Sequence, residues 1–354
     1  MELIDILKIA AARGASDLHL AAGRPAVARV DGLLVNMEGE PLTSAEIERM
    51  LHAVLTKDRI HKLEQTRELD FALSIPGMDR FRVNIHFQKG GIAASLRVIP
   101  ALIRDFKQLG LPIRVCEWLA RRPAGLVLVT GPTGSGKSTT LAAMIDLINS
   151  ERACHIITIE DPIEYVHAHK QALVEQREVH QDTASFHNAL KHILRQDPDV
   201  IMIGEMRDHE TISTALTAAE TGHLVLSTLH TADTVQTVDR IVDVFPPHQQ
   251  GQIRVQLASV LEGVFSQILM PSASGHGREL AMESLVATDA VRTLIREGKT
   301  HQICTHLEAG GSAGMNTMAR AIAELLKRER ISRDTAFAYA RKVDELKRHM
   351  QMMI

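Results

Sequence analysis

The sequence predicts a two-domain α/β protein in which a smaller α+β domain precedes a larger domain built on a parallel sheet. The length of 354 residues is enough for about two domains of roughly 150 residues each. Several short runs within the first 99 residues alternate apolar and polar residues, which is typical of an antiparallel sheet. Farther along, continuous apolar runs alternate with helical stretches, which indicates a parallel sheet buried on both faces.

The first domain is predicted to span residues 1–99. Apolar residues recur on one helical face in residues 1–13, and Thr43 and Glu46 form a capping box before a second helix. The expected strands follow the alternating runs at residues 16–20, 25–30, 33–37, 69–75, 80–88 and 92–99. These elements together indicate an α+β domain.

Residues 100–113 are predicted to form a linker because they contain two prolines and a glycine. The second domain then spans residues 114–354. Its expected strands are the apolar runs at residues 125–130, 155–160, 199–204 and 223–228. From about residue 279 onward the pattern favours a mostly helical chain.

Composition narrows the classes of function. The formal net charge is −3 and aromatic residues make up 3% of the chain, which disfavours a nucleic-acid-binding protein. The three cysteines form no CxxC pair, so no zinc site or disulfide framework is expected. The first residues lack a basic signal-peptide start and a cleavage site, and no apolar run reaches the roughly 20 residues that span a bilayer. We therefore expect a cytoplasmic protein whose membrane association is peripheral.

The firmest functional signal is GPTGSGKST at residues 131–139, which lies between a predicted strand and a predicted helix. Glycines let the loop curl so that its N–H groups face phosphate, and the helix N-terminus favours negative charge. Lys137 is expected to reach the β- and γ-phosphates, and Ser138 to ligate Mg²⁺. The ligands predicted here are ATP and Mg²⁺. The predicted contacts are Gly131, Pro132, Thr133, Gly134, Ser135, Gly136, Lys137, Ser138 and Thr139.

The apolar run at 199–204 raises a question, because the strand that follows a phosphate loop usually ends in an aspartate that helps to hold Mg²⁺. Here Gly204 stands in that place and Glu205 follows. In RecA-like proteins another strand intervenes in sequence, which makes 155–160 that strand and 199–204 the Walker B strand. The run at 223–228 would then lie between the phosphate-loop strand and Walker B, with His230 pointing toward the γ-phosphate.

Four motifs together resemble the Walker A, Asp box, Walker B and His box of the secretion ATPases of type II secretion and type IV pilus systems. They are GPTGSGKST (131–139), ITIEDPIE (157–164), IMIGEMRDHET (201–211) and TGHLVLSTLHT (221–231). AVRTLIREGK (290–299) is similar to a signature of the retraction ATPase (PilT) family, although Thr293 stands where that signature more often has Asn. The resemblance implies a homohexamer with a PAS-like N-terminal domain and a RecA-like P-loop ATPase domain.

The resemblance also implies roles for the carboxylates that follow the strands. Glu164 would be the general base, and Glu205 would hold Mg²⁺ through a bound water. The reverse assignment stays open, because the Walker B glutamate is the base in many P-loop ATPases. Glu160 and Asp161 of the Asp box would contact the nucleotide, with a helix cap or a salt bridge as the alternative.

Cationic residues complete the predicted site. Arg82 and Arg97 lie on successive predicted strands, and the family places arginines from these strands against a nucleotide. Arg207 follows Walker B and is expected to act across a subunit boundary. His230 is predicted to sense the γ-phosphate, and His223 to contact the nucleotide.

The implied function is a hexameric ATPase that powers type IV pilus retraction and twitching motility. It would work in the cytoplasm, at the inner face of the membrane under a platform protein. A second retraction ATPase is a candidate partner, and no nucleic acid is expected. The alternatives are an accessory retraction ATPase of the PilU type and a type II secretion or pilus assembly ATPase. The tetracysteine zinc module of the assembly motors has no counterpart here, which favours retraction.

The signature at 290–299 is expected to form a short helix that begins after Thr288 and ends at Gly298. Its apolar residues recur at helical spacing, which predicts one face packed on the core. We expect the charged residues, including Arg292 and Arg296, to lie on the opposite, polar face and to contact a partner.

Overall fold

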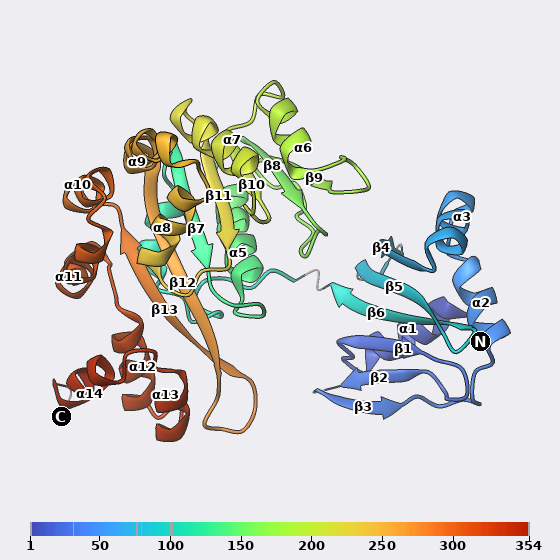
Figure 1. Ribbon diagram of the computed structural model, residues 1–354. Coiled ribbons are helices and arrows are strands. Elements are labelled where there is room, and N and C mark those ends of the chain that lie inside the picture. The colour runs from blue at the N-terminus through green and yellow to red at the C-terminus, as the bar shows by residue number, and fades with distance from the viewer. Residues whose placement is uncertain (1, 31, 76, 79, 100–101, 353–354) are drawn as a thin grey trace. The chain divides into compact units, whose positions relative to one another are not determined.

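The computed structural model describes residues 2–30, 32–75, 77–78, 80–99 and 102–352, so residues 100 and 101 of the predicted linker lie outside the described residues. The chain divides into two compact units, Met1–Leu102 and Ile103–Ile354 (Figure 1). Each unit has its own apolar core.

The first unit is built on a six-stranded antiparallel sheet with the order β3-β2-β1-β6-β5-β4. Its strands are β1 (Asp17–Leu20), β2 (Val27–Val30), β3 (Leu33–Asn36), β4 (Glu68–Ser74), β5 (Arg80–Gln88) and β6 (Gly91–Ile99). Its helices are α1 (Leu3–Ala12), α2 (Ser44–His52) and α3 (Lys57–Thr66). The predicted α+β architecture and its six strands are confirmed. Helix α3 was not anticipated from the sequence, because it buries only Leu63 and shows no apolar stripe.

The capping box at the start of α2 is present. The Thr43 hydroxyl accepts from the Glu46 amide, and the Thr43 amide donates to the Glu46 carboxylate at 2.8 Å. Two N–H groups at the helix start thereby gain partners. The helix then buries Ile47, Met50 and Leu51 in the core of the first unit.

The second unit is built on a seven-stranded sheet with the order β13-β12-β7-β11-β10-β8-β9. All neighbouring pairs are parallel except β12 and β13, which are antiparallel. The strands are β7 (Gly125–Thr130), β8 (His155–Glu160), β9 (Leu173–Glu178), β10 (Val200–Ile203), β11 (Leu224–Leu229), β12 (Leu261–Pro271) and β13 (Arg278–Val286). The four predicted strands are confirmed, and β11 lies between β7 and β10 as the strand order required.

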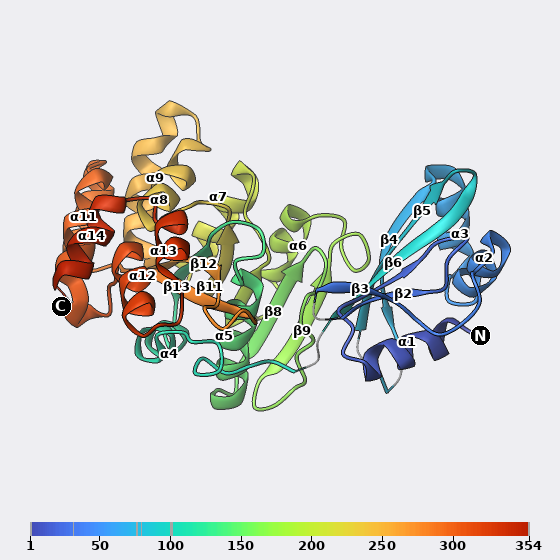
Figure 2. The same cartoon turned by 90° about the horizontal axis from the view of Figure 1, so that it is seen from below.

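Eleven α-helices accompany this sheet in the described part of the second unit. Figure 2 shows α4 and α5 on one face of the sheet and α7 and α9 on the other. The helices are α4 (Ile113–Ala120), α5 (Lys137–Glu151), α6 (Phe186–Ile193), α7 (His209–Glu220), α8 (Thr234–Asp243), α9 (Pro247–Val260), α10 (Asp289–Glu297), α11 (Ile303–Ala309), α12 (Met318–Lys327), α13 (Arg333–Tyr339) and α14 (Val343–Met352). Among the residues described, no helix combines the length and apolarity needed to cross a membrane.

Three strands of this sheet were not expected. The prediction that the chain is mostly helical from about residue 279 is wrong up to Val286, because residues 278–286 form β13. The buried polar residues Glu262, Ser266 and Gln267 interrupt β12, so this strand does not read as a continuous apolar run. β9 is the outermost strand on one side of the sheet, and it carries mostly polar side chains.

Helix α10 carries residues 290–297 of the signature at 290–299 and agrees with the prediction except at Arg292. Thr288 caps its first turn, Gly298 ends it with a positive φ, and its apolar residues are buried. Arg292 was expected on the polar face, but its guanidinium pairs with the buried Glu262 at 2.8 Å and donates to the carbonyls of Ala258 and Ser259. Those carbonyls lie in the last turn of α9, where they have no partner within the helix. Arg292 therefore fastens α10 to α9 and β12.

Replacing Arg292 by alanine is expected to lower the free energy of unfolding by about 2 kcal/mol, because it removes one of the two arginine partners of the buried Glu262 and the side-chain donor to two carbonyls at the end of α9. Arg296→Ala is the matched control, since Arg296 is exposed on the same helix and surface changes stay within about 0.5 kcal/mol. Urea unfolding followed by the fluorescence of the single tryptophan, Trp118 in α4, measures both. Equal stability of the two variants would show that Arg292 does not fasten this helix.

Candidate active site

Most of the predicted site residues of the second unit lie at the carboxyl ends of its parallel strands. β7, β8, β10 and β11 are parallel and adjacent in register, so their carboxyl ends lie side by side. The phosphate loop follows β7, the Asp box follows β8, Gly204 and Glu205 follow β10, and His230 follows β11. In open α/β sheets, ligands bind outside the carboxyl ends of the strands.

The phosphate loop can be built only with glycine at its turning points. Gly131, Gly134 and Gly136 have φ values of 140°, 77° and 90°, which other residues rarely adopt. A Cβ atom on Gly131 would also lie 2.3 Å from the carbonyl oxygen of Gln267. Gly136 is the N-cap of α5, and no side chain caps this helix. The first N–H groups of α5 are therefore available to an anion.

Lys137 is buried at the start of α5, and its ammonium donates to the carbonyls of Gly131 and Pro132 at 2.9 and 3.1 Å. Burial lowers the pKa of Lys137, and the charges of Glu205 and Glu164 oppose this shift. A buried ammonium beside open helix N–H groups fits the negative charge of a nucleotide phosphate chain.

The hydroxyl groups after Lys137 lie in two environments. Thr139 bonds to the Tyr165 hydroxyl at 2.8 Å, which ties the phosphate loop helix to the segment after the Asp box. Ser138 is half-buried at the first turn of α5. A hydroxyl together with a nearby carboxylate such as Glu205 is an oxygen donor set of the kind that Mg²⁺ prefers.

The Glu205 carboxylate contacts one histidine and one arginine. One carboxylate oxygen lies 3.2 Å from Nε2 of His230, and the other lies 2.7 Å from the guanidinium of Arg207. Burial alone would raise the pKa of Glu205, but Arg207 and His230 outweigh it and hold the pKa below its usual value. A carboxylate that is ionised and engaged at both oxygens is a weak proton acceptor but a stable partner for a metal-bound water. This geometry favours Glu205 as an Mg²⁺-water ligand over Glu205 as the base.

Glu164 is exposed at the same edge, and its charge acts on Lys137. No side-chain partner of its carboxylate is found among the described residues. Its backbone amide donates to the buried carboxyl of Glu160 at 3.3 Å. Glu164 is therefore free to accept a proton from water, while its backbone is held in place.

The Glu160 carboxyl is buried at the end of β8 and is engaged by neighbouring groups. It is 6% exposed, and its oxygens accept from the Thr158 hydroxyl, the Gln176 amide and the Glu164 backbone. Burial raises its pKa to about 7. These contacts are neither the helix cap nor the salt bridge predicted as the alternative, but they hold Glu160 as a buried, hydrogen-bonded carboxyl. Asp161 is exposed beside it, and its charge acts on Arg207.

His223 is not brought into the site. It precedes β11 at the amino ends of the parallel strands, because Leu224 pairs with Gly125, the first residue of β7. The six residues of β11 separate it from His230 by roughly 20 Å. Its ring bonds to the carbonyl of Ala218 at 2.9 Å, so within one chain it closes the turn after α7 instead of contacting the nucleotide.

Arg82 and Arg97 are direct register partners on β5 and β6, as their predicted hairpin required. Both are exposed, and Arg97 pairs with Asp17 of β1 at 2.8 Å. Burial would raise the pKa of Asp17, but the hydrogen bonds from Arg97 and Ser16 and the charge of Arg97 lower it overall. The first unit thus presents two neighbouring arginines on one face of its sheet.

One cationic residue at the phosphate loop was missed. Arg278, the first residue of β13, donates to the carbonyl of Gly134 at 3.3 Å. Gln267 of β12 supports the loop from the same side, because its amide donates to the Thr140 hydroxyl at 2.8 Å. Neither contact could be inferred from the sequence, since both depend on the unexpected pair of strands β12 and β13.

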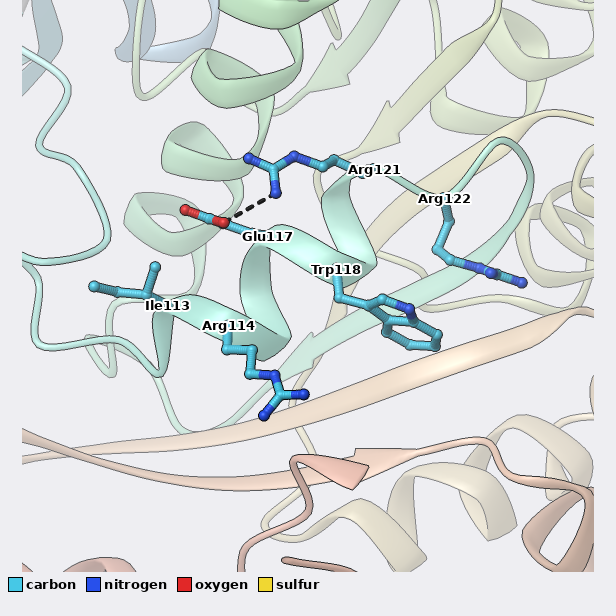
Figure 3. A pocket seen from close by; sticks show the side chains of 6 residues that line it. All are labelled: Ile113, Arg114, Glu117, Trp118, Arg121 and Arg122. Atoms are coloured by element: carbon cyan, nitrogen blue, oxygen red, sulfur yellow. Dashed lines mark hydrogen bonds and ion pairs between the residues drawn. The ribbon is translucent and has the colours of Figure 1, made fainter. Parts of the chain in front are cut away.

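A hollow of about 490 Å³ also lies along α4, and Figure 3 shows the side chains that line it. Two of its three arginines are already engaged: Arg121 bonds to Glu117 and Glu151, and Arg122 pairs with Glu262. All of its lining residues come from 113–122. It contains none of the residues of the phosphate loop or of the strand ends, and we assign it no role in the reaction.

Known proteins resemble this chain over nearly its whole length. The family described as Type II/IV secretion system protein matches residues 2–352. The Type IV pilus retractation ATPase PilT of Pseudomonas aeruginosa is 46% identical over 336 residues, which cover 95% of this chain and 97% of that protein. The Type IV pilus ATPase PilU of the same species is 38% identical over 347 residues, covering 98% and 91%. A crystal structure of the pilus retraction motor PilT with bound ADP has a TM-score of 0.93 at 47% identity and covers 98% of this chain and 99% of that chain. This chain therefore belongs to the Type II/IV secretion system protein family.

Proposed function

We propose that this chain hydrolyses ATP with Mg²⁺ to power the retraction of type IV pili. The observation that carries the proposal is the convergence of the phosphate loop, Glu164, Glu205 and His230 at one sheet edge. The chain that holds this edge is similar over nearly its full length to a retraction ATPase. A steady-state assay of phosphate release from ATP tests the enzymatic half of the proposal.

The residues at these strand ends would have different roles in ATP hydrolysis. Ser138 and, through water, Glu205 would hold Mg²⁺, which neutralises phosphate charge when bound. Glu164 takes a proton from the attacking water, whose oxygen bonds to the γ-phosphorus as the bond to the ADP oxygen breaks. Lys137 and the N–H groups of α5 stabilise the charge that spreads over the phosphate oxygens. His230 orients Glu205 and reports whether the γ-phosphate is present.

We further propose that the working form is a homohexamer in which neighbouring subunits share each site. Arg82 and Arg97 belong to a different unit from the phosphate loop and have exposed guanidinium groups. Arg207 is exposed at the sheet edge. Arginines supplied from a neighbour to the γ-phosphate contribute about 10³–10⁵ in rate in other phosphoryl-transfer enzymes. Hydrolysis would then turn the domain at 1–99 against the domain at 114–354 through the linker at 100–113.

Mixing two inactive variants tests this sharing. Arg97→Ala and Lys137→Ala chains are each expected to be inactive alone, whereas a 1:1 mixture should regain activity at about a quarter of its sites if mixing is random in a ring. The matched control is Arg24→Ala, which changes an exposed arginine of the same unit and should keep its activity alone. Native mass spectrometry confirms mixing. Mixed rings that show no recovery would contradict a shared site.

Sequence identity favours a retraction ATPase over an accessory retraction ATPase. Identity is 46% to the retraction ATPase and 38% to the accessory-type PilU. An assembly or secretion motor is less favoured because the zinc module of those motors is absent from this sequence. As a retraction motor, the ring would work in the cytoplasm, docked on an inner-membrane platform protein. A second retraction ATPase would be its partner in the same ring or on the same platform.

A further inference from the structure

A cavity of about 230 Å³ lies behind the loop that carries His230. The N-terminal turns of α8 and α12, helix α11 and the start of α14 enclose it, and these elements can be followed in Figures 1 and 2. Its walls are mainly apolar, formed by side chains such as Val235, Leu307, Met318 and Ile322. A cavity of about 150 Å³ with such walls admits benzene, so this one has room for a single ring with a short chain.

Carboxylates dominate the polar part of this cavity. Four acidic side chains line it, against two basic ones: Asp233, Glu283, Glu308 and Glu345 against Arg341 and Lys342. Three of these acids have a cationic partner: Asp233 pairs with Arg341 at 3.6 Å, Glu345 with Lys342 at 2.9 Å, and Glu308 with Arg348, which is not part of the lining, at 4.0 Å. Glu283 has no cationic partner among the described residues. Burial and the charges of nearby carboxylates raise the pKa of the Cys304 thiol at the wall, and Lys342 only partly opposes them. The cavity therefore favours a positive charge.

Glu283 connects the cavity to the active site. This buried carboxylate accepts from the Thr234 amide and hydroxyl at 2.9 and 2.7 Å and from the Met318 amide at 3.3 Å. It therefore holds the first residues of both α8 and α12. One of its oxygens has a single donor, which leaves capacity for a further N–H group.

The chain segment that joins the cavity wall to His230 in the active site is short. Residues 231–233 join His230 to α8, and the cavity wall includes Ala232 and Asp233. The Ser266 hydroxyl donates to the Ala232 carbonyl at 3.1 Å, and Thr231 bonds to Thr237 at 2.6 Å. The cavity wall therefore lies within three residues of His230, which in turn contacts Glu205.

We propose that this cavity binds a small molecule with an apolar body and a cationic amine, and that its occupancy regulates ATP turnover by shifting the segment from His230 to Thr234. The regulatory half rests on the proposed ATPase function, whereas the binding half does not. A ligand of about nine heavy atoms in such a site binds in the millimolar range. Coupling between sites commonly changes the affinity or response severalfold.

The test uses the full chain and Cys304 as a reporter. In a Cys154→Ser background, Cys304 is the accessible thiol, because Cys116 is 0% exposed. Labelling rates are measured with cationic 2-aminoethyl and anionic 2-sulfonatoethyl methanethiosulfonate and normalised to a free model thiol. Phenethylamine and phenylacetate are then added as competing probes of the same size and opposite charge. The Cys304→Ser version reports background labelling.

We expect the cationic reagent to react at least about fivefold faster after normalisation, and phenethylamine but not phenylacetate to slow labelling at millimolar concentration. Glu308→Gln, an exposed acid at the rim, should weaken this protection, and phenethylamine should change ATP turnover of the wild-type chain at least about twofold. Unreactive Cys304, equal protection by phenylacetate, or protection without any change in turnover would each overturn the proposal. Turnover of the untreated wild type reports separately on the proposed ATPase function.

Discussion

Replacing Lys137 by alanine is expected to lower ATP turnover at least about 100-fold, because one preorganised charge at a developing anion contributes 10²–10³ or more. The Lys137 ammonium is buried and held by two carbonyls of its own loop, so its position is already fixed in the absence of nucleotide. Its position at the start of α5 adds the N–H groups of the helix to the same charge.

Steady-state phosphate release measures this effect, with Lys170→Ala as the matched control. Lys170 is an exposed lysine of the same unit that pairs with Asp146 at 2.7 Å, and surface pairs of this kind contribute little to stability. The control should keep nearly full turnover. Turnover of the Lys137→Ala chain within tenfold of wild type would show that the nucleotide is not held by this loop.

Glu164→Gln is expected to cut turnover by about 10²–10⁴, the usual effect of removing a general base, while ATP binding stays largely intact. The side chain is exposed beside Lys137, and its backbone is fixed by Glu160. Glu205→Gln should also cut turnover, but through the metal, because Glu205 is already engaged by Arg207 and His230.

The dependence of turnover on Mg²⁺ concentration separates the two carboxylates. The Glu205→Gln chain should need more Mg²⁺ to reach half of its maximal rate, whereas the Glu164→Gln chain should keep the wild-type requirement. Nucleotide affinity is measured in parallel to show that both variants still bind. If Glu164→Gln keeps more than a tenth of the wild-type rate, Glu164 is not the base and the reverse assignment is correct.

The sequence was most informative where one short stretch determines the structure. Four buried strands are continuous apolar runs in the sequence. The phosphate loop needs glycines at fixed positions, and these positions form a recognisable motif. The place of β11 between β7 and β10 followed from the strand order of P-loop proteins and is confirmed. The pairing of Arg82 with Arg97 followed from the register of a simple hairpin.

The sequence was least informative where a residue depends on a partner far along the chain. Arg292 reads as a surface charge on an amphipathic helix, but its partner Glu262 is 30 residues away. Arg278 of β13 reaches the carbonyl of Gly134 across 144 residues, and β13 itself was not predicted. His223 was assigned to the nucleotide because it flanks a buried strand, yet the direction of that strand places it at the opposite edge.

The most direct test of the account follows fluorescently labelled pili in living cells that lack this gene. Cells complemented with the wild-type chain should extend and retract their pili, whereas cells complemented with Glu164→Gln should extend pili that do not retract and accumulate on the surface. Immunoblots show that both chains are present in equal amount. Bald cells after deletion, or normal retraction with the Glu164→Gln chain, would contradict the assignment of this protein as an ATP-driven retraction motor.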